Sequence, residues 1–383
     1  MLERVEVVIN GTVLSIETGK VAKQANGSAW VRFGDTVVLG AAVCADPRDE
    51  DQDFLPLQIE YREKAYAAGK IPGGYIKREG RPSEKEILSA RLTDRPLRPL
   101  FPDKYNNELQ VHLTTLSSDQ ENDADVLGMV AASASLSVSD IPFYNPIGAV
   151  RVGRINGEFI ANPTFSQLEE SDLNMIAAGT RDHLNMVEGG TKELNEDELL
   201  EGLRFAHDEI IKIIDAIDEL KGRLNVKKSE FVPPEIPEGL EEEIRNRTSQ
   251  KIHDANRIQD KNEHNEAISA IQDEAMEALE EQFPECEAKI TAIIKEIEKE
   301  DMRRMILDED KRMDGRSMDE VRPITCEIGV LPRAHGSAIF TRGQTQALVA
   351  TTLGTKMDEQ RIDDLEGESF KSFMLHYNFP SYS

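Results

Sequence analysis

A short block occurs twice in this chain, and it constrains the fold more than any other feature of the sequence. The first copy reads GSAWVRFGDTVVL from Gly27, and the second reads GSAIFTRGQTQAL from Gly336. Each copy places two runs rich in β-forming residues on either side of a Gly-X pair. This pattern predicts a β-hairpin, because glycine readily adopts the positive φ that a tight reversal needs. A second match follows each copy, LQIEY from Leu57 and FMLHY from Phe373.

The two copies are about 310 residues apart, which is too far for the stacked units of a repeat protein. They predict a domain that is present twice, with a different segment between the copies. We expect an α+β chain in four parts. These are a first domain over 1–225, a linker over 226–237, an all-helical domain over 238–310 and the beginning of the second copy over 311–383.

The overall charge is strongly acidic, with a formal net charge of −27 over 383 residues. This balance argues against general coating of nucleic acid, and it makes a local basic stretch more informative. No run of about 18 apolar residues occurs, so neither a membrane-spanning helix nor a membrane partner is expected. The cysteines are far apart, which is typical of a reducing cytoplasm, and each is expected to be a small core residue. They are Cys44, Cys286 and Cys326.

Alternating apolar residues, helical spacing and turn residues predict the remaining elements of the first domain. The Asn156-Gly157 pair predicts a further tight hairpin. An Ala- and Ser-rich helix is expected to pack closely on a sheet. The expected strands lie at 5–17, 109–116 and 147–153, and the expected helices at 126–139 and 198–220.

The segment 238–310 differs in character, because it holds 22 acidic and 10 basic residues and no strand-like run. Its apolar residues recur at helical spacing, which predicts about four helices. A solvated spacer bundle is the expected role, with an interaction surface as the alternative.

The stretch 61–98 has the most unusual composition, with ten basic and five acidic residues. Its first half, from Gly69 to Gly80, is a glycine-rich loop with one aromatic residue and adjacent cations. Its second half begins at Ser83, and Glu86 three residues later completes the pattern of a capping box at a helix start. The apolar residues expected to face inward are Ile87, Leu88 and Leu92. The arginines expected to share one helical face are Arg91, Arg95 and Arg98.

Two interpretations of this stretch are open. One is a phosphate track, in which arginine forks bind phosphate oxygens, glycines allow close approach of the backbone and Tyr75 stacks on an unpaired base. The other is an ordinary helix whose arginines are balanced by Glu84, Glu86 and Asp94. Spacing alone favours the second, since runs of surface charge are usually just solvated.

Two features that could suggest a metal or catalytic site have simpler interpretations. The acidic run over 46–53 lacks ligand spacing and is expected to be a solvated loop. His335 precedes the second hairpin with no nucleophile pattern nearby, so a structural role is expected.

Longer motifs resemble those of a known family. They are YAAGKIPG from Tyr66, REGRPSE from Arg78, ARLTDRPLRPLFP from Ala90, LPRAHGSA from Leu331 and HYNFP from His376. With these motifs, the chain resembles the N-terminal part of the bacterial polynucleotide phosphorylases over essentially its whole length.

The resemblance implies two RNase PH-like domains joined by a helical domain and followed by RNA-binding KH and OB domains. It implies a cytoplasmic, ring-shaped homotrimer that degrades single-stranded RNA from the 3′ end with inorganic phosphate and Mg²⁺. The reaction would release nucleoside diphosphates in mRNA turnover, and its reverse would polymerise RNA without a template. Proteins of RNA-degradation complexes are implied as partners.

The resemblance also assigns RNA-binding residues. The constriction of the family's RNA channel matches 74–78, where some members carry two aromatics and two arginines. This chain has Tyr75-Ile76 and Lys77-Arg78 there, so one stacking platform is absent. Arg81 matches a phosphate-contacting arginine of single-domain relatives. The arginines that match residues implicated in RNA handling are Arg91, Arg95 and Arg98.

The first domain departs from the family at one informative place. Related active domains have a Gly/Ser/Thr-rich phosphate loop before the Ala/Ser-rich helix, whereas this chain reads DQENDAD from Asp119. Carboxylates repel phosphate, and no cation in the run offsets them, so this domain is not expected to catalyse phosphorolysis.

The family's catalytic serine-rich loop, metal-binding aspartates and lysine are expected after Ser383. No catalytic or metal-binding residue is therefore expected within the chain, and the chain alone is expected to be inactive. A non-catalytic RNA-binding ring scaffold is the alternative function.

Overall fold

The computed structural model describes residues 2–47, 54–73, 75–233 and 236–382. They form two compact units, one combining Met1–Pro233 with Glu359–Ser383 and the other being Pro234–Asp358. Most of the acidic run over 46–53 lies outside the described residues, as does Gly74 of the basic stretch. These two units differ from the four parts that the sequence predicts, and the boundaries of those four parts remain predictions.

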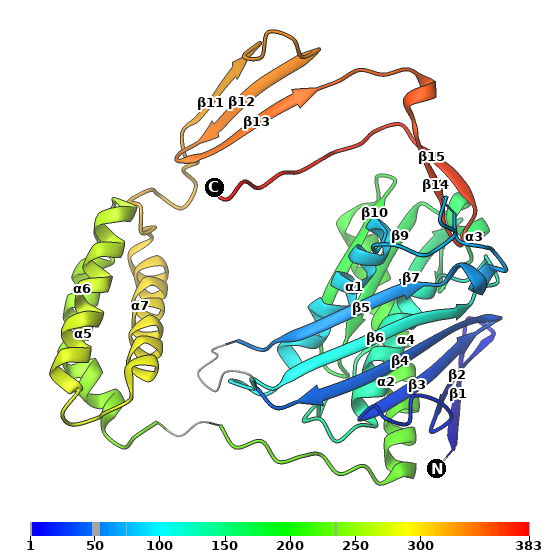
Figure 1. Ribbon diagram of the computed structural model, residues 1–383, viewed down its shortest axis with the longest axis horizontal. Helices are drawn as coiled ribbons and strands as arrows, with labels where there is room; N and C mark the ends of the chain where they lie inside the picture. The colour runs from blue at the N-terminus through cyan, green and yellow to red at the C-terminus, as the bar shows by residue number, and fades with distance from the viewer. Residues whose placement is uncertain (1, 48–53, 74, 234–235, 383) are drawn as a thin grey trace. The chain divides into compact units, whose positions relative to one another are not determined.

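A six-stranded sheet forms one half of the first unit (Figure 1). Its strand order is β1-β2-β3-β4-β6-β5, and all neighbours are antiparallel except β5 and β6. The strands predicted over 5–17 and 109–116 are confirmed as β1, β2 and β6. The bounds are β1 (Glu3–Ile9), β2 (Thr12–Thr18), β3 (Gly27–Phe33), β4 (Thr36–Ala45), β5 (Leu57–Glu63) and β6 (Glu108–Ser117).

A four-stranded antiparallel sheet, ordered β10-β9-β7-β8, forms the other half. Asn156 and Gly157 between β7 and β8 have φ of 53° and 85°, as the predicted type I′ turn requires. The bounds are β7 (Gly148–Ile155), β8 (Glu158–Ala161), β9 (Leu173–Gly179) and β10 (Leu184–Thr191), with the short helix α3 (Phe165–Glu170) after β8. Helix α3 has only six residues and buries none of them, so the sequence carries no apolar pattern that would predict it.

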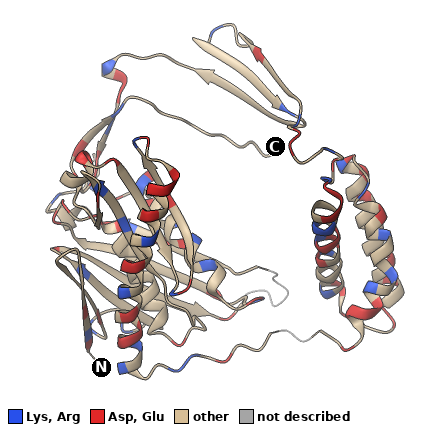
Figure 2. Cartoon of the chain, turned by 180° about the vertical axis from the view of Figure 1, so that it is seen from behind, with Lys and Arg blue, Asp and Glu red and all other residues tan. Residues whose placement is uncertain are grey.

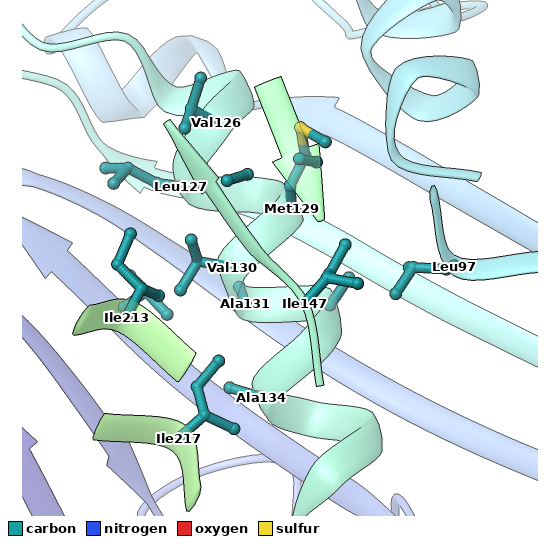
Figure 3. Close-up of a cluster of buried hydrophobic side chains, with 14 of the residues drawn as sticks. Leu97, Val126, Leu127, Met129, Val130, Ala131, Ala134, Ile147, Ile213 and Ile217 are labelled. Atoms are coloured by element: carbon teal, nitrogen blue, oxygen red, sulfur yellow. The ribbon is translucent and has the colours of Figure 1, made fainter. Parts of the chain in front are cut away.

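Helix α2 (Ala124–Ser137) packs on β3 and β4 and also contacts β7 of the second sheet. Every residue of α2 is buried, and Figure 3 shows its apolar side chains beside Ile217 of α4 (Glu196–Leu224). Small residues allow the close contact, because a Cβ on Gly40 of β4 would lie 2.6 Å from the carbonyl oxygen of Ala131. The predicted packing of an Ala- and Ser-rich helix on a sheet is confirmed.

The repeated block forms the same hairpin in both copies. The first copy is β3 and β4, and the second is β12 (Gly336–Arg342) and β13 (Thr345–Thr351). Gly34 and Gly343 at the two reversals have the same φ, 60°. Each hairpin also pairs with the strand before it, β2 in the first copy and β11 (Ile324–Ile328) in the second. The prediction of a duplicated hairpin is therefore confirmed.

The second match, LQIEY and FMLHY, differs between the copies. Leu57 begins strand β5, whereas residues 373–377 adopt no strand. The reason is the partner: β5 pairs with β6, and no described strand pairs with 373–377. The preceding residues instead form a hairpin of β14 (Gln360–Asp363) and β15 (Glu368–Lys371), which belongs to the first unit.

The second unit contains three helices within its described residues, α5 (Leu240–Ala255), α6 (Lys261–Leu279) and α7 (Glu287–Glu309). The expectation of about four is wrong, because Ile244 and Ile252 lie on the buried face of one continuous helix. Figure 2 shows acidic and basic residues along these helices, as a solvated bundle requires.

Two expectations from composition have different outcomes. No helix in the described part of the chain is long and apolar enough to cross a membrane. Of the three cysteines, Cys286 is buried and Cys44 is half-buried, but Cys326 is exposed. Cys326 lies on β11, whose five residues are all exposed, so the expectation of a core position is wrong there.

Candidate nucleic-acid interface

The basic stretch continues from β5 through a loop into helix α1 (Glu84–Leu97). The predicted capping box is present, because the Ser83 hydroxyl accepts the Glu86 N–H at 3.1 Å and the Glu86 carboxylate accepts the Ser83 N–H at 2.6 Å. The same carboxylate accepts the N–H of Glu63, the last residue of β5, at 2.8 Å. The local sequence thus fixes both the start of α1 and its attachment to the sheet.

The buried face of α1 is the predicted one only at Leu92, which is half-buried and packs against the core. Ile87 and Leu88 are 49% and 55% exposed. Helix α1 also buries Glu86, whose carboxylate accepts hydrogen bonds from the cap and from β5, the small residues Ser89 and Thr93, and Pro96 and Leu97 at its end. The Thr93 hydroxyl donates to the Ser89 carbonyl at 2.9 Å, so its burial leaves no unpaired donor. Small side chains let α1 approach β5 closely, and this turns two of the large apolar residues outward.

Arg91 and Arg95 of α1 and Arg98 at its C-cap have different surroundings. Arg91 is exposed and makes no ion pair or hydrogen bond with the described residues. Arg95 forms an exposed ion pair with Glu188 of β10, with 2.5 Å between Nη1 and Oε2. Arg98 binds both carboxylate oxygens of Asp94, at 2.8 and 2.6 Å. Arg98 also donates to the carbonyl oxygens of Leu55 and Leu57 at the start of β5, at 2.8 and 3.0 Å.

The loop before α1 presents unpaired groups to solvent. The Tyr75 side chain is fully exposed. Lys77 has a φ of 55°, in the left-handed region that residues other than glycine seldom adopt. Lys77, Arg78 and Arg81 are exposed, and none of them pairs with another residue in the described part of the chain.

The other cations of the stretch are mostly held in place. Lys64 lies 2.7 Å from Glu79, and hydrogen bonding from Lys64 helps to hold the pKa of Glu79 below its ordinary value. Arg62 donates to the Gly80 carbonyl at 2.9 Å. Lys70 and Lys85 bind the β14–β15 hairpin. The unpaired cations are therefore Lys77, Arg78, Arg81 and Arg91.

Two cavities accompany these cations within the first unit. The larger, about 920 Å³, is lined by Arg91 and Arg95 together with residues of β14. The smaller, about 260 Å³, is lined by Arg78 and Arg81. The loop and α1 thus form one surface with free cations at two places.

The loop over 119–125, where the resemblance leads one to expect a phosphate loop, is held by hydrogen bonds to its own carboxylate. The Asp119 carboxylate accepts the Thr36 hydroxyl at 2.9 Å and the backbone N–H groups of Glu121 and Asn122 at 3.0 and 2.8 Å. Burial raises the pKa of Asp119, but the hydrogen bonds outweigh burial and hold that pKa below its ordinary value. A carboxylate thus takes the backbone donors that a phosphate loop would offer to its ligand.

A buried cation balances the other two carboxylates of this loop. Arg151 of β7 lies 2.8 Å from Asp123 and 3.0 Å from Asp125, and all three side chains are nearly buried. Burial and the charge of Asp123 raise the pKa of Asp125 to about 7. A compensating charge therefore reaches the loop from β7, where Arg151 binds both carboxylates and Asn174 through its Nη atoms, while its buried Nε has no hydrogen-bond partner. The alternation of apolar and polar residues along β7 does not predict that Arg151 lies buried beside these carboxylates.

His335 has the structural role that the sequence predicts. Its Nδ1 accepts the backbone N–H of Leu353 at 2.9 Å, which ties the start of β12 to the end of β13. No group of three or more His, Cys, Asp or Glu side chains among the described residues is arranged to hold a metal ion.

Three family descriptions match the chain. "3' exoribonuclease family, domain 1" matches residues 13–142 and again 320–383. "3' exoribonuclease family, domain 2" matches 145–209, and "Polyribonucleotide nucleotidyltransferase, RNA binding domain" matches 239–317. The chain belongs to the 3′ exoribonuclease family. The same description matches both copies of the repeated hairpin, in agreement with the duplication.

Curated relatives support the same resemblance. The polyribonucleotide nucleotidyltransferase of Gemmatimonas aurantiaca is 50% identical over 384 residues, covering 100% of this chain and 52% of the relative. That of Geotalea uraniireducens is 48% identical over 383 residues, covering 100% of this chain and 55% of the relative. The chain thus spans about half the length of the curated relatives it matches. Rice Rrp46, a solved structure, is 16% identical with a TM-score of 0.45 and covers 54% of this chain and 94% of its own.

Proposed function

We propose that this chain is the RNA-binding portion of a polyribonucleotide nucleotidyltransferase, which shortens single-stranded RNA from the 3′ end with inorganic phosphate. A phosphate oxygen attacks the last phosphodiester, the 3′-oxygen of the shortened RNA leaves and takes up a proton, and a nucleoside diphosphate is released. Membership of the 3′ exoribonuclease family and the names of the full-length relatives support this reaction for the whole protein.

One observation carries the proposal for this chain: unpaired cations lie on the loop and on α1 of a protein whose net charge is −27. Groups that serve folding are held by carboxylates, as Lys64 is held by Glu79. Exposed cations without such partners are available for the phosphates of an RNA strand. They are Lys77, Arg78, Arg81 and Arg91.

The remaining predicted residues receive roles that follow from their contacts. Tyr75 offers an exposed ring on which an unpaired base stacks. Arg95 binds RNA phosphate after exchanging its exposed partner Glu188. Arg98 positions the track, because its guanidinium holds the start of β5.

The proposal for the whole protein includes Mg²⁺, which would offset charge on the phosphates. The resemblance to the family implies that its ligands belong to the second domain. A homotrimeric ring in the cytoplasm, acting in mRNA turnover with proteins of RNA-degradation complexes, completes the proposal.

A non-catalytic RNA-binding scaffold is the second candidate, and the closed loop at 119–125 favours it for the first domain. The donors of this loop are taken by Asp119, and its cation Arg151 is engaged by two carboxylates. The assay that separates the two candidates is the phosphate-dependent release of nucleoside diphosphates from RNA by the full-length protein.

The test is RNA binding by the Lys77→Ala/Arg78→Ala variant, measured as fluorescence anisotropy of labelled oligoadenylate at several salt concentrations. Loss of two phosphate contacts should weaken binding and flatten the plot of log affinity against log salt by roughly 1.4. The control is Lys23→Ala/Arg204→Ala, which removes two exposed cations from elsewhere in the first unit. An affinity and a salt slope equal to those of the unmodified chain would contradict the proposal.

A further inference from the structure

The β14–β15 hairpin (Gln360–Lys371), here called the strap, is attached to the basic stretch by ion pairs. Lys70 Nζ lies 3.2 Å from an Asp363 carboxylate oxygen and donates to the Asp364 carbonyl. Lys85 pairs with Glu366 of the strap turn and also lies 3.0 Å from a carboxylate oxygen of Glu63 on β5. In a further ion pair the strap supplies the cation, because Lys371 of β15 lies 3.0 Å from Glu84 at the start of α1.

Only a small part of the strap is buried. Leu365 is 5% exposed, and its carbonyl accepts the Gln120 side-chain amide at 2.7 Å. Most other strap residues are exposed. A two-stranded hairpin is marginally stable by itself, and exposed ion pairs contribute little. The docked position therefore depends on one leucine and on salt-sensitive contacts, which makes it readily reversible.

The strap lies between the two groups of free cations. Asp363 and Asp364 line both cavities of the first unit. Arg91 lies in the wall of the larger cavity and Arg81 in the wall of the smaller. An RNA strand that runs from the loop to α1 would therefore pass beside Asp363 and Asp364. The strap at the same time binds the ammonium groups of Lys70 and Lys85.

We propose that the strap competes with RNA for the basic stretch. When docked, it supplies carboxylates in the place of phosphates and interrupts the track between Arg81 and Arg91. When RNA occupies the track, its phosphates replace Asp363 and Glu366 as partners of the two lysines, and the strap is released. This inference rests on the proposed RNA track.

The test neutralises the two strap carboxylates that pair with lysines and leaves Leu365 unchanged. The Asp363→Asn/Glu366→Gln variant of the full chain should bind labelled oligoadenylate about 3- to 10-fold more tightly than the unmodified chain. Its log affinity should fall more steeply with log salt, by roughly 0.7, because Lys70 loses its carboxylate partner while Lys85 keeps Glu63. The matched control is Glu201→Gln/Asp208→Asn, which makes the same charge change at exposed positions of α4 that have no ion-pair partner among the described residues.

Hydrogen exchange of the strap amides gives an independent readout, because added oligoadenylate should speed exchange across 360–371 if the strap is released. Slower exchange, or equal affinities for the strap variant and its control, overturns the competition. The Arg81→Ala/Arg91→Ala variant tests the track itself. If it binds RNA as the unmodified chain does, the track and the strap proposal both fail. If it loses binding while the strap variant is unchanged, only the strap proposal fails.

Discussion

Arg95 and Arg98 show how residues of one motif on one helical face acquire different roles. The exposed pair of Arg95 with Glu188 is of a kind that contributes about 0–1 kcal/mol to stability. Arg98 instead satisfies two backbone carbonyls and both oxygens of Asp94. The spacing of the arginines in the sequence cannot separate these roles, because the carbonyls belong to residues more than 40 positions away.

The first prediction contrasts these two arginines. Arg95→Ala should change the melting temperature by no more than a few degrees and weaken RNA binding. Arg98→Ala should lower the free energy of unfolding by about 1–3 kcal/mol, because it leaves carbonyl groups without their donor. Urea denaturation and RNA anisotropy on both variants measure the contrast. A collapse of stability in Arg95→Ala would instead favour a purely structural ion pair.

A second prediction concerns Asp125, whose pKa is raised to about 7 by burial and by the charge of Asp123. The unfolded carboxyl titrates near pH 4, so the folded state holds its proton more tightly than the unfolded state. The stabilising contribution is full below about pH 4, declines as pH rises and is lost above about pH 7. Arg151 pairs with both carboxylates and therefore limits this loss of stability.

Asp125→Asn removes this titration, so its free energy of unfolding should fall less than that of the unmodified chain between pH 5 and pH 8. Urea denaturation of both proteins at the two pH values measures the difference. Parallel pH dependences would show that Asp125 stays ionised in the folded state. Asp208→Asn is the control, because this carboxyl is exposed and has no ion-pair partner in the described part of the chain.

At the scale of elements, the sequence predicts features that depend on neighbouring residues. The cap at Ser83, the reversals at Gly34 and Gly343 and the Asn156-Gly157 turn all depend on contacts a few residues apart. The sequence is less informative where a distant partner decides. On helix α1, Ser89 and Thr93 are buried and Leu88 is exposed, which the apolar pattern of the sequence does not predict.

The same limit applies to strands and to the site. The strand at Leu57 exists because β6 lies beside it, and the matching residues at 373–377 have no described partner. The strap escaped prediction altogether, because its attachment joins residues almost 300 positions apart. The cations of the basic stretch could be identified from composition, but their division into paired and unpaired groups could not.

At the scale of the whole molecule, the first unit holds one copy of the duplicated hairpin, and the second unit holds a group of helices and the other copy. The first unit has the six-stranded and four-stranded sheets and a fully buried helix between them. The second copy presents a three-stranded sheet whose residues are mostly exposed. The chain matches about half the length of its relatives, so the catalytic chemistry of the family need not lie in the described residues.

The last prediction is that the 383-residue chain alone does not catalyse phosphorolysis. Attack by phosphate on a phosphodiester brings two anions together, so donors and cations must hold both. In the first domain, Asp119 occupies the backbone donors of the loop, and Arg151 is neutralised by Asp123 and Asp125. The unpaired cations of the loop and of α1 can bind RNA, but they offer no acid for the leaving 3′-oxygen.

The measurement is incubation of the purified chain with RNA, phosphate and Mg²⁺, followed by chromatography for nucleoside diphosphates. No product above background is expected, while labelled RNA should still bind. The full-length protein, assayed in parallel, is the positive control for the reaction conditions. Robust product that disappears in Asp119→Asn or Asp123→Asn would place the active site in the first domain. That result would show that the carboxylates of the closed loop take part in the chemistry instead of blocking it.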